Sequence, residues 1–306
     1  MKPSKKYSGI VIPAVTPLTQ EHQLDEAAVD KVLDYFRRHK VHPFILGTTG
    51  ESASIPVQMK KQFVQLAGKL KREGEMLYVG ISSNCLSESI DAAKECFDLG
   101  VDAVAATLPT YYALTEDEML RYFEQLANSI RGPLIIYNIP ATTHMSIPLP
   151  LIEKLSYHEH IVGTKDSERS EERLKTSMEW WSNRADFSHF LGWAARSAEA
   201  LRNGSDGLIP STGNLFPSVY RDMMDAVNSG DEERANRLQQ LSDLLGNLYQ
   251  SGRTLGGSLW ALKVLMQEAG LCGPWVMPPL REGSREEAAQ LLHDLNELKK
   301  KENINF

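Results

Sequence analysis

The chain has 306 residues, a formal net charge of −7 and an apolar fraction of 42%, values that are ordinary for a globular protein of one large domain or two average ones. The net negative charge argues against binding to a nucleic acid, which needs a basic surface. No apolar stretch is close in length to the roughly 18 residues that a membrane helix needs. Three cysteines without metal-ligand spacing, and a charged N-terminus (Met1–Lys6) with no signal-peptide core behind it, predict a cytoplasmic protein without a membrane partner, metal or cofactor.

Eight short apolar runs, many of them β-branched, recur at intervals of about 20 to 35 residues and predict β-strands. They cover residues 10–15, 43–46, 77–81, 103–108, 134–139, 161–163, 187–191 and 207–209. Helical periodicity fills segments between them, at residues 24–36, 87–99, 170–181 and 194–203. Another helix is predicted from a capping box at Thr115–Glu118 to Gly132.

This alternation predicts an α/β protein, a (β/α)8 TIM barrel. An open doubly wound sheet is the alternative, but no glycine-rich dinucleotide fingerprint follows the first strand. Beyond about residue 216 the strand signals stop, and a capping box at Ser284–Glu287 and a proline-rich connector at Gly273–Leu280 separate helical segments. These helices are predicted at residues 219–227, 232–249, 258–269 and 286–301. We therefore predict a barrel domain at residues 1–224 and a C-terminal helical domain at residues 225–306.

Polar or glycine-containing segments follow six of the eight predicted strands. In a βα barrel the loops at the C-terminal ends of the strands build the active site. The segments are Gly47–Ser52, Pro109–Tyr112, Tyr137–Thr143, Lys165, Gly192–Trp193 and Pro210–Asn214. We expect them to meet on one rim of the barrel.

Lys165 stands in Gly163–Ser167, at the end of an apolar run. Most lysines are solvated at the surface, which is the alternative here. Inside a barrel rim, partial desolvation lowers the pKa of an amine and frees its lone pair to attack a ketone and form a Schiff base. Tyr137 can then act as a general acid/base, or serve only in a structural hydrogen bond. The amides and hydroxyls of Gly47–Gly50 can bind a carboxylate, although glycine turns after strands are common.

Three motifs together, Gly47–Glu51, Tyr137–Pro140 and Gly163–Asp166, resemble those of the dihydrodipicolinate synthase/N-acetylneuraminate lyase family of class I aldolases. The resemblance covers nearly the whole chain. It implies a TIM barrel with a C-terminal helical domain, usually assembled as a homotetramer of two tight dimers. It also implies that Lys165 forms the Schiff base with pyruvate or another 2-oxo acid and that Tyr137 carries the proton.

The same resemblance assigns the residues around this pair. It implies that Thr48 and Thr49, between Gly47 and Gly50, bind the carboxylate. Thr48 would link Tyr137 to a tyrosine of the partner subunit, which is identified as Tyr111 from its distance to Thr115, with Tyr112 as the weaker possibility. Packing at a dimer contact is the alternative role for this tyrosine.

Two specificity features of the family are missing. Synthases of the family carry an arginine where this chain has Thr142, and sialic acid lyases carry acidic residues where it has Gly192–Ala195. His144 stands where a glycine is usual, whereas Ser211–Thr212 resembles the Ser-Thr pair at strand eight of the sialic acid lyases. Trp193 can form an apolar pocket wall or simply pack. The residues expected on the substrate side are Gly47, Thr49, Gly50, Thr142, Gly192, Trp193, Ile209 and Ser211.

The prediction is a Schiff-base lyase acting on pyruvate or a hydroxylated 2-oxo acid, either an aldolase or a dehydratase for a 2-oxo-3-deoxy sugar acid. Dihydrodipicolinate synthase (4-hydroxy-tetrahydrodipicolinate synthase) and N-acetylneuraminate lyase remain as alternatives within the family. A non-catalytic protein that binds a 2-oxo acid is the alternative from another class. Aldol cleavage, dehydration and condensation stay open, as does the choice between dimer and tetramer.

Overall fold

A computed structural model describes residues 5–305 of the chain; the charged N-terminus through Ser4 and the terminal Phe306 lie outside the described residues. Eight parallel strands form a closed barrel in chain order. The strands are β1 (Gly9–Pro13), β2 (His42–Ile45), β3 (Tyr78–Gly80), β4 (Ala103–Ala106), β5 (Leu134–Asn138), β6 (Ile161–Asp166), β7 (Ser188–Leu191) and β8 (Gly207–Leu208). The predicted eight strands and the predicted TIM barrel are confirmed. The end of the sixth strand differs from the prediction at residue 163. Strand β6 continues to Asp166, so Lys165 lies inside the strand rather than after it.

The helices agree with the sequence wherever capping or periodicity was clear. Thr115 and Ser284 both form the predicted capping boxes, and the connector at Gly273–Leu280 is not helical. The helices are α1 (Glu26–Arg38), α2 (Val57–Leu70), α3 (Leu86–Asp98), α4 (Glu116–Ile130), α5 (Pro140–Thr143), α6 (Leu149–Leu155), α7 (Glu171–Trp181), α8 (Ser197–Arg202), α9 (Pro217–Ser229), α10 (Glu232–Gln250), α11 (Leu255–Glu268) and α12 (Arg285–Glu302), with short 3-10 turns η1 (Ala194–Arg196) and η2 (Ser211–Asn214). The ranges predicted from sequence did not include α2, α5 or α6.

The chain divides into two compact units that do not follow the order of the sequence. The first unit contains the chain up to Val11 together with Met76–Pro210, and the second contains Ile12–Glu75 together with the chain from Ser211 onward. The sequence-based boundary between residues 224 and 225 falls inside α9. The assignment of a separate C-terminal helical domain stays a prediction.

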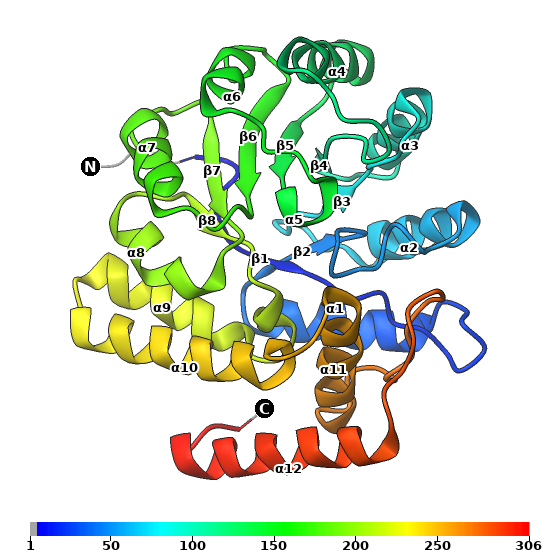
Figure 1. Cartoon of the computed structure of the whole chain (residues 1–306), viewed down its shortest axis with the longest axis vertical. Coiled ribbons are helices and arrows are strands. Elements are labelled where there is room, and N and C mark those ends of the chain that lie inside the picture. Colours follow the sequence, from blue (N-terminus) through cyan, green and yellow to red (C-terminus); the bar gives the residue numbers. More distant parts are fainter. Residues whose placement is uncertain (1–4, 306) are drawn as a thin grey trace. The chain divides into compact units, whose positions relative to one another are not determined.

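In the first unit, strands β3 to β8 pair in sequence, and β8 also pairs with the start of β1. Helix α3 contacts β4 and α7 contacts β7, while α4 contacts both α3 and α6 (Figure 1). A buried ion pair sits just before β8, where Lys5 Nζ lies 2.7 Å from Asp206 Oδ2 and both side chains are 2% exposed. Lys5 also donates to the carbonyl oxygens of Trp181 and Phe187.

In the second unit, helices α9 to α12 contact one another, with α10 and α11 each touching α12. Helix α11 is apolar on nearly all sides and buries every residue from Ser258 to Met266, as expected for a helix inside a core. A smaller apolar cluster joins Leu18, Ile55, Met59 and Met277, and so connects the loop after β1 to the connector before α12. Over residues 5–305, no helix is both long and apolar enough to cross a membrane.

Candidate active site

Lys165 and Tyr137 lie side by side on neighbouring strands of the first unit. Their Cα atoms are register partners between β5 and β6, and Lys165 Nζ lies 3.9 Å from the centroid of the Tyr137 ring. Lys165 is 3% exposed and Tyr137 is 4% exposed. The structure thus brings together the amine and the phenol that the sequence singled out.

The burial of Lys165 changes its acidity. Burial lowers the pKa of the Lys165 amine below its usual 10.5, and the interaction and hydrogen bond with Tyr137 oppose that fall. Desolvation acts in this direction because it disfavours the charged form of a base. A lysine with a lowered pKa exposes its lone pair more often, and an amine of this kind is the nucleophile of Schiff-base chemistry.

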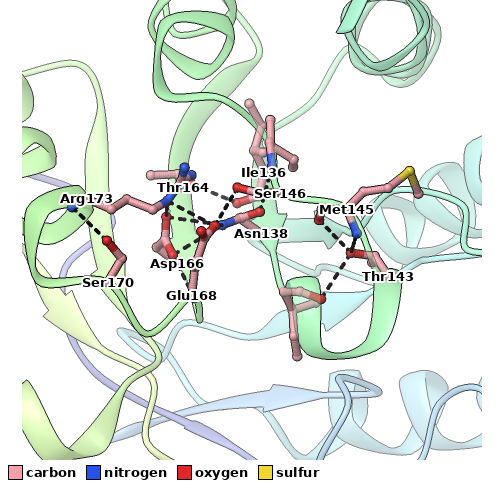
Figure 2. A network of polar contacts seen from close by, with 12 residues as sticks. Ile136, Asn138, Thr143, Met145, Ser146, Thr164, Asp166, Glu168, Ser170 and Arg173 are labelled. Atoms are coloured by element: carbon pink, nitrogen blue, oxygen red, sulfur yellow. Dashed lines mark hydrogen bonds and ion pairs between the residues drawn. The ribbon is translucent and has the colours of Figure 1, made fainter. Parts of the chain in front are cut away.

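The residue after each of these two, Asn138 and Asp166, belongs to the opposite face of the sheet, because side chains alternate along a strand. Figure 2 shows them in one polar network. Asn138 Nδ2 donates to Asp166 Oδ1 at 3.3 Å and to Glu168 Oε2 at 3.0 Å. Arg173 Nε, from α7, donates to Asp166 Oδ2 at 2.5 Å. The network therefore ties the ends of β5 and β6 to each other and to α7.

The network also fixes the loops that follow these strands. Glu168 accepts a hydrogen bond of 2.6 Å from the Ser146 hydroxyl. Asn138 Oδ1 accepts a hydrogen bond of 3.0 Å from the backbone N–H of Ile147. Burial raises the pKa of the Asp166 carboxyl, while the Arg173 guanidinium opposes that rise. Burial also acts to raise the pKa of Glu168, but the hydrogen bonds it accepts outweigh this effect and the pKa is lowered.

Sequence reasoning did not foresee this network. Asn138 and Asp166 were read only as members of motifs, and Arg173 only as part of a helix. The available signal was the strand alternation, which places a polar residue behind each catalytic candidate. Glycines support the same region: a Cβ on Gly163 would lie 2.6 Å from the carbonyl oxygen of Ser188 on β7, so β6 and β7 approach closely only because that position is glycine.

The predicted carboxylate-binding turn, Gly47–Gly50, follows β2 in the second unit. Thr49 is buried and Thr48 is half-buried. A Cβ on Gly50 would lie 3.0 Å from the carbonyl oxygen of Ala14 and 3.1 Å from the backbone nitrogen of Leu46, so a side chain at this position would crowd the backbone around it. The carbonyl of Gly50 accepts a hydrogen bond of 2.6 Å from Thr16 Oγ1.

The turn is bracketed by two residues in the left-handed region. Leu46 and Glu51 both have φ of 56°. For residues other than glycine this conformation costs of the order of 1–3 kcal/mol each, and it persists only where surrounding contacts enforce it. Strain of this type concentrates at functional sites.

Glu51 makes the contacts that hold the far end of the turn. It is 4% exposed, and its Oε1 lies 2.5 Å from Lys263 Nζ of α11, a close charge contact without the alignment of a hydrogen bond. Its Oε2 accepts a hydrogen bond of 2.6 Å from the N–H of Met277. Lys263 Nζ donates to the carbonyl of Trp275 at 2.7 Å. No local sequence signal predicts this pair, because its members are far apart in the chain.

The two tyrosines after β4 lie on the surface. Tyr111 is 78% and Tyr112 is 73% exposed, and their rings make an edge-to-face contact at 4.9 Å. The Asn84 side chain accepts hydrogen bonds from the N–H groups of Thr110 and Tyr111 at 2.7 and 3.2 Å. The loop is therefore ordered by Asn84 while both rings are presented outward. The role of Tyr111 in a neighbouring subunit stays a prediction.

The remaining candidates of the first unit flank β5, β7 and β8. Thr142 is half-buried in α5, and its N–H donates to the carbonyl of Ile139 at 3.1 Å. Gly192 donates its N–H to the carbonyl of Asp166 at 2.6 Å, which connects it to the network behind Lys165. The guanidinium of Arg196 makes a cation–π contact with Trp193, 5.5 Å from the centroid of its ring.

Ile209 is buried, and its N–H donates to the carbonyl of Leu191 at 2.8 Å. Ser211 belongs to the second unit, where its hydroxyl lies 2.7 Å from the hydroxyl of Tyr249. The convergence of Ser211 and of Gly47–Gly50 with Lys165 stays a prediction. Among residues 5–305, no group of three or more His, Cys, Asp and Glu side chains is arranged to hold a metal ion.

Comparison with known proteins adds a family to this geometry. A model of the dihydrodipicolinate synthetase family matches residues 6–298. The 4-hydroxy-tetrahydrodipicolinate synthase of Alkalilimnicola ehrlichii is 29% identical over 282 residues, which span 92% of this chain and 94% of that protein.

Solved structures agree with the sequence comparison. The dihydrodipicolinate synthase of Bacteroides thetaiotaomicron superimposes with a TM-score of 0.91 at 27% identity, covering 96% of this chain and 99% of that one. YagE, a prophage protein of the same family from E. coli K12 that was solved in complex with pyruvate, superimposes with a TM-score of 0.90 at 25% identity and the same coverage.

Proposed function

Because the chain belongs to the dihydrodipicolinate synthetase family, we propose that it is a Schiff-base lyase of the class I aldolase type whose covalent intermediate forms on Lys165. The observation that carries the proposal is the buried Lys165 amine, with its lowered pKa, against the ring of Tyr137. A non-catalytic binding protein has no need of a desolvated amine beside a phenol.

The chemistry follows from these two groups. Lys165 Nζ attacks the 2-oxo carbon, and loss of water gives a protonated imine. The imine accepts the electron pair when the bond between C3 and C4 breaks, while Tyr137 takes the proton of the C4 hydroxyl as general base. The C4 fragment leaves as an aldehyde, the remaining enamine takes a proton at C3 to give the imine of pyruvate, and water hydrolyses this imine to release pyruvate and the free Lys165 amine. In a dehydration, removal of a C3 proton gives the enamine, which expels the C4 hydroxyl as water.

The rest of the site is proposed from the family motifs. Thr48 and Thr49 bind the substrate carboxylate through amides and hydroxyls, and Thr48 passes protons between Tyr137 and the Tyr111 of a partner subunit. These roles are supported by the turn, in which Thr49 is buried and Thr48 half-buried between the left-handed residues Leu46 and Glu51, and by the exposure of Tyr111. The assembly is then a homo-oligomer, a tetramer built as a dimer of dimers.

The substrate is proposed to be a 2-oxo-3-deoxy sugar acid, because Thr142 cannot pair with a second carboxylate in the bidentate way of arginine. The name of the relative from Alkalilimnicola ehrlichii favours the second candidate, 4-hydroxy-tetrahydrodipicolinate synthase. The two candidate activities differ in what the residue at position 142 must bind. In a sugar-acid lyase it faces a neutral polyol, and in the synthase it faces an aldehyde that carries a carboxylate.

A panel of 2-oxo-3-deoxy acids, screened for pyruvate release and for loss of water, tests the proposal against condensation of pyruvate with aspartate semialdehyde. We expect turnover of one or more panel members and poor condensation. Thr142→Arg should raise the condensation and lower turnover of the preferred acid. Efficient condensation by the wild type would instead assign the synthase activity.

A further inference from the structure

The turn that follows β2 is contacted by α11 and by the connector before α12, which lie outside the three motifs described above. Leu46 and Glu51, on either side of Gly47–Gly50, adopt the left-handed conformation with φ of 56°. A conformation that is unfavourable for these residues reverts unless other contacts enforce it. Beyond local backbone hydrogen bonds, the contacts of the Glu51 side chain come from α11 and from the connector that precedes α12.

These contacts are buried and charged. The Glu51 and Lys263 side chains are both 0% exposed, with Oε1 and Nζ 2.5 Å apart. The N–H of Met277 donates to the other carboxylate oxygen at 2.6 Å, and Lys263 donates to the carbonyl of Trp275 at 2.7 Å. Glu51 is therefore bound through both oxygens, which fixes the orientation of its carboxylate and of the backbone that carries it.

We propose that the Glu51–Lys263 ion pair is a positioning device, through which the C-terminal helices hold the Gly47–Gly50 turn in the shape that binds the substrate carboxylate. The inference rests on the proposed function, because it takes Thr48 and Thr49 as the carboxylate ligands. It adds that affinity for a 2-oxo acid depends on Lys263, a residue of α11. Neither member of the pair is expected to touch the substrate.

A buried pair elsewhere in the chain gives a matched control. Lys5 and Asp206 also form a buried ion pair, 2.7 Å long with both side chains 2% exposed. Asp206 directly precedes β8 and so lies at the N-terminal end of that strand. In a TIM barrel this face contributes to stability, whereas the C-terminal face carries the active site. Breaking either pair removes a buried charge partner, but only the Glu51–Lys263 pair adjoins the binding turn.

The test measures how much ketone is needed to half-saturate borohydride trapping on Lys165. Two ketones are compared in the full-length protein, pyruvate and hydroxyacetone, which lacks the carboxylate. The variants are Lys263→Met, the double variant Glu51→Gln/Lys263→Met, and the control Lys5→Met/Asp206→Asn. The double variant removes both charges at similar volume, so it folds even if Lys263→Met leaves an intolerable buried carboxylate.

In the double variant we expect half-saturation by pyruvate to need about tenfold more ketone or higher, because the turn loses the charged contact that anchors Glu51. Hydroxyacetone should be trapped as in the wild type, to within about twofold. The control should lose thermal stability but keep its response to pyruvate. A merely structural role of the pair would instead affect both ketones alike.

Wild-type affinity for pyruvate in the double variant would overturn the inference. An equal loss of pyruvate affinity in the control would overturn it as well, because general destabilisation would then explain the effect. Failure of the proposed function looks different, since the wild type itself would then show no label on Lys165 or no preference for pyruvate over hydroxyacetone.

Discussion

Replacing Arg173 with methionine removes the positive partner of a buried carboxylate directly behind Lys165. The Arg173 side chain is 10% exposed and the Asp166 side chain is 4% exposed, and their contact is 2.5 Å. Breaking a buried pair by removing one member costs about 3–5 kcal/mol, because the remaining charge is left uncompensated. With about 2.1 cal/mol/K of unfolding entropy per residue over 306 residues, Arg173→Met should lower Tm by about 5–8 °C.

The loss should depend on pH in a defined direction. Burial already raises the pKa of Asp166, and removing Arg173 removes the group that opposes the rise. The unfolded pKa of an Asp carboxyl is about 3.9. When the folded pKa lies above it, the carboxyl adds to the free energy of unfolding at pH values below the unfolded pKa. That stabilisation is lost as pH rises through the folded pKa. Arg173→Met should therefore be more destabilised at pH 8 than at pH 5.

Thermal unfolding followed by circular dichroism at both pH values checks this expectation. The double variant Arg173→Met/Asp166→Asn should recover most of the lost Tm and should not show the extra loss at pH 8, because the buried carboxyl that titrates is gone. As a matched control, Arg121→Met breaks the pair with Asp117 on the exposed face of α4, where the side chains are 66% and 63% exposed, and should shift Tm by less than about 1 °C. An Arg173→Met protein as stable as the wild type, or equally destabilised at both pH values, would refute the reasoning.

Two further predictions concern the catalytic groups. Because burial lowers the pKa of Lys165, the initial rate of imine formation should rise with pH through a midpoint below 10.5, as measured by borohydride trapping; a midpoint at or above 10.5 contradicts the account. If a partner subunit supplies Tyr111, Lys165→Ala and Tyr111→Phe subunits should each be impaired alone and partly recover activity when reassembled together, since a mixed dimer keeps one intact site. Mixed dimers no more active than their parents would leave Tyr111 as a packing residue.

The barrel could be predicted because each strand is marked locally. Short apolar runs bounded by glycine or proline, such as Leu134–Asn138, need no knowledge of distant residues. Strand β6 was predicted too short, since Thr164, Lys165 and Asp166 end the apolar pattern although all three are buried. In a closed barrel both faces of a strand are covered, so a polar residue with buried partners does not end the strand.

The missing helices have a related cause. Helix α2 begins after Pro56 with no side-chain cap, and α5 and α6 are short helices that begin at or just after proline. These starts lack the Ser, Thr or Asp signal that revealed the caps at Thr115 and Ser284. The missing cap is not the whole cause, because α3 was predicted although it also begins without a side-chain cap.

The candidate site was predictable to the extent that its residues lie in local motifs. Lys165 and Tyr137 were found because each ends an apolar run, and strand register brings them together. The partners that hold them were not found, since Arg173 reaches Asp166 across a strand-to-helix turn. Similarly, Lys263 reaches Glu51 from a helix far along the chain. Pairings of this kind are set by tertiary packing and leave no spacing pattern in the sequence.

The central claim is that Lys165 carries the covalent intermediate. Incubation with pyruvate and borohydride, followed by proteolysis and mass spectrometry, tests it most directly. We predict a stable pyruvate-derived adduct on the peptide that contains Lys165, and no adduct in Lys165→Ala. An adduct on another lysine, or labelling that persists unchanged in Lys165→Ala, would contradict the account.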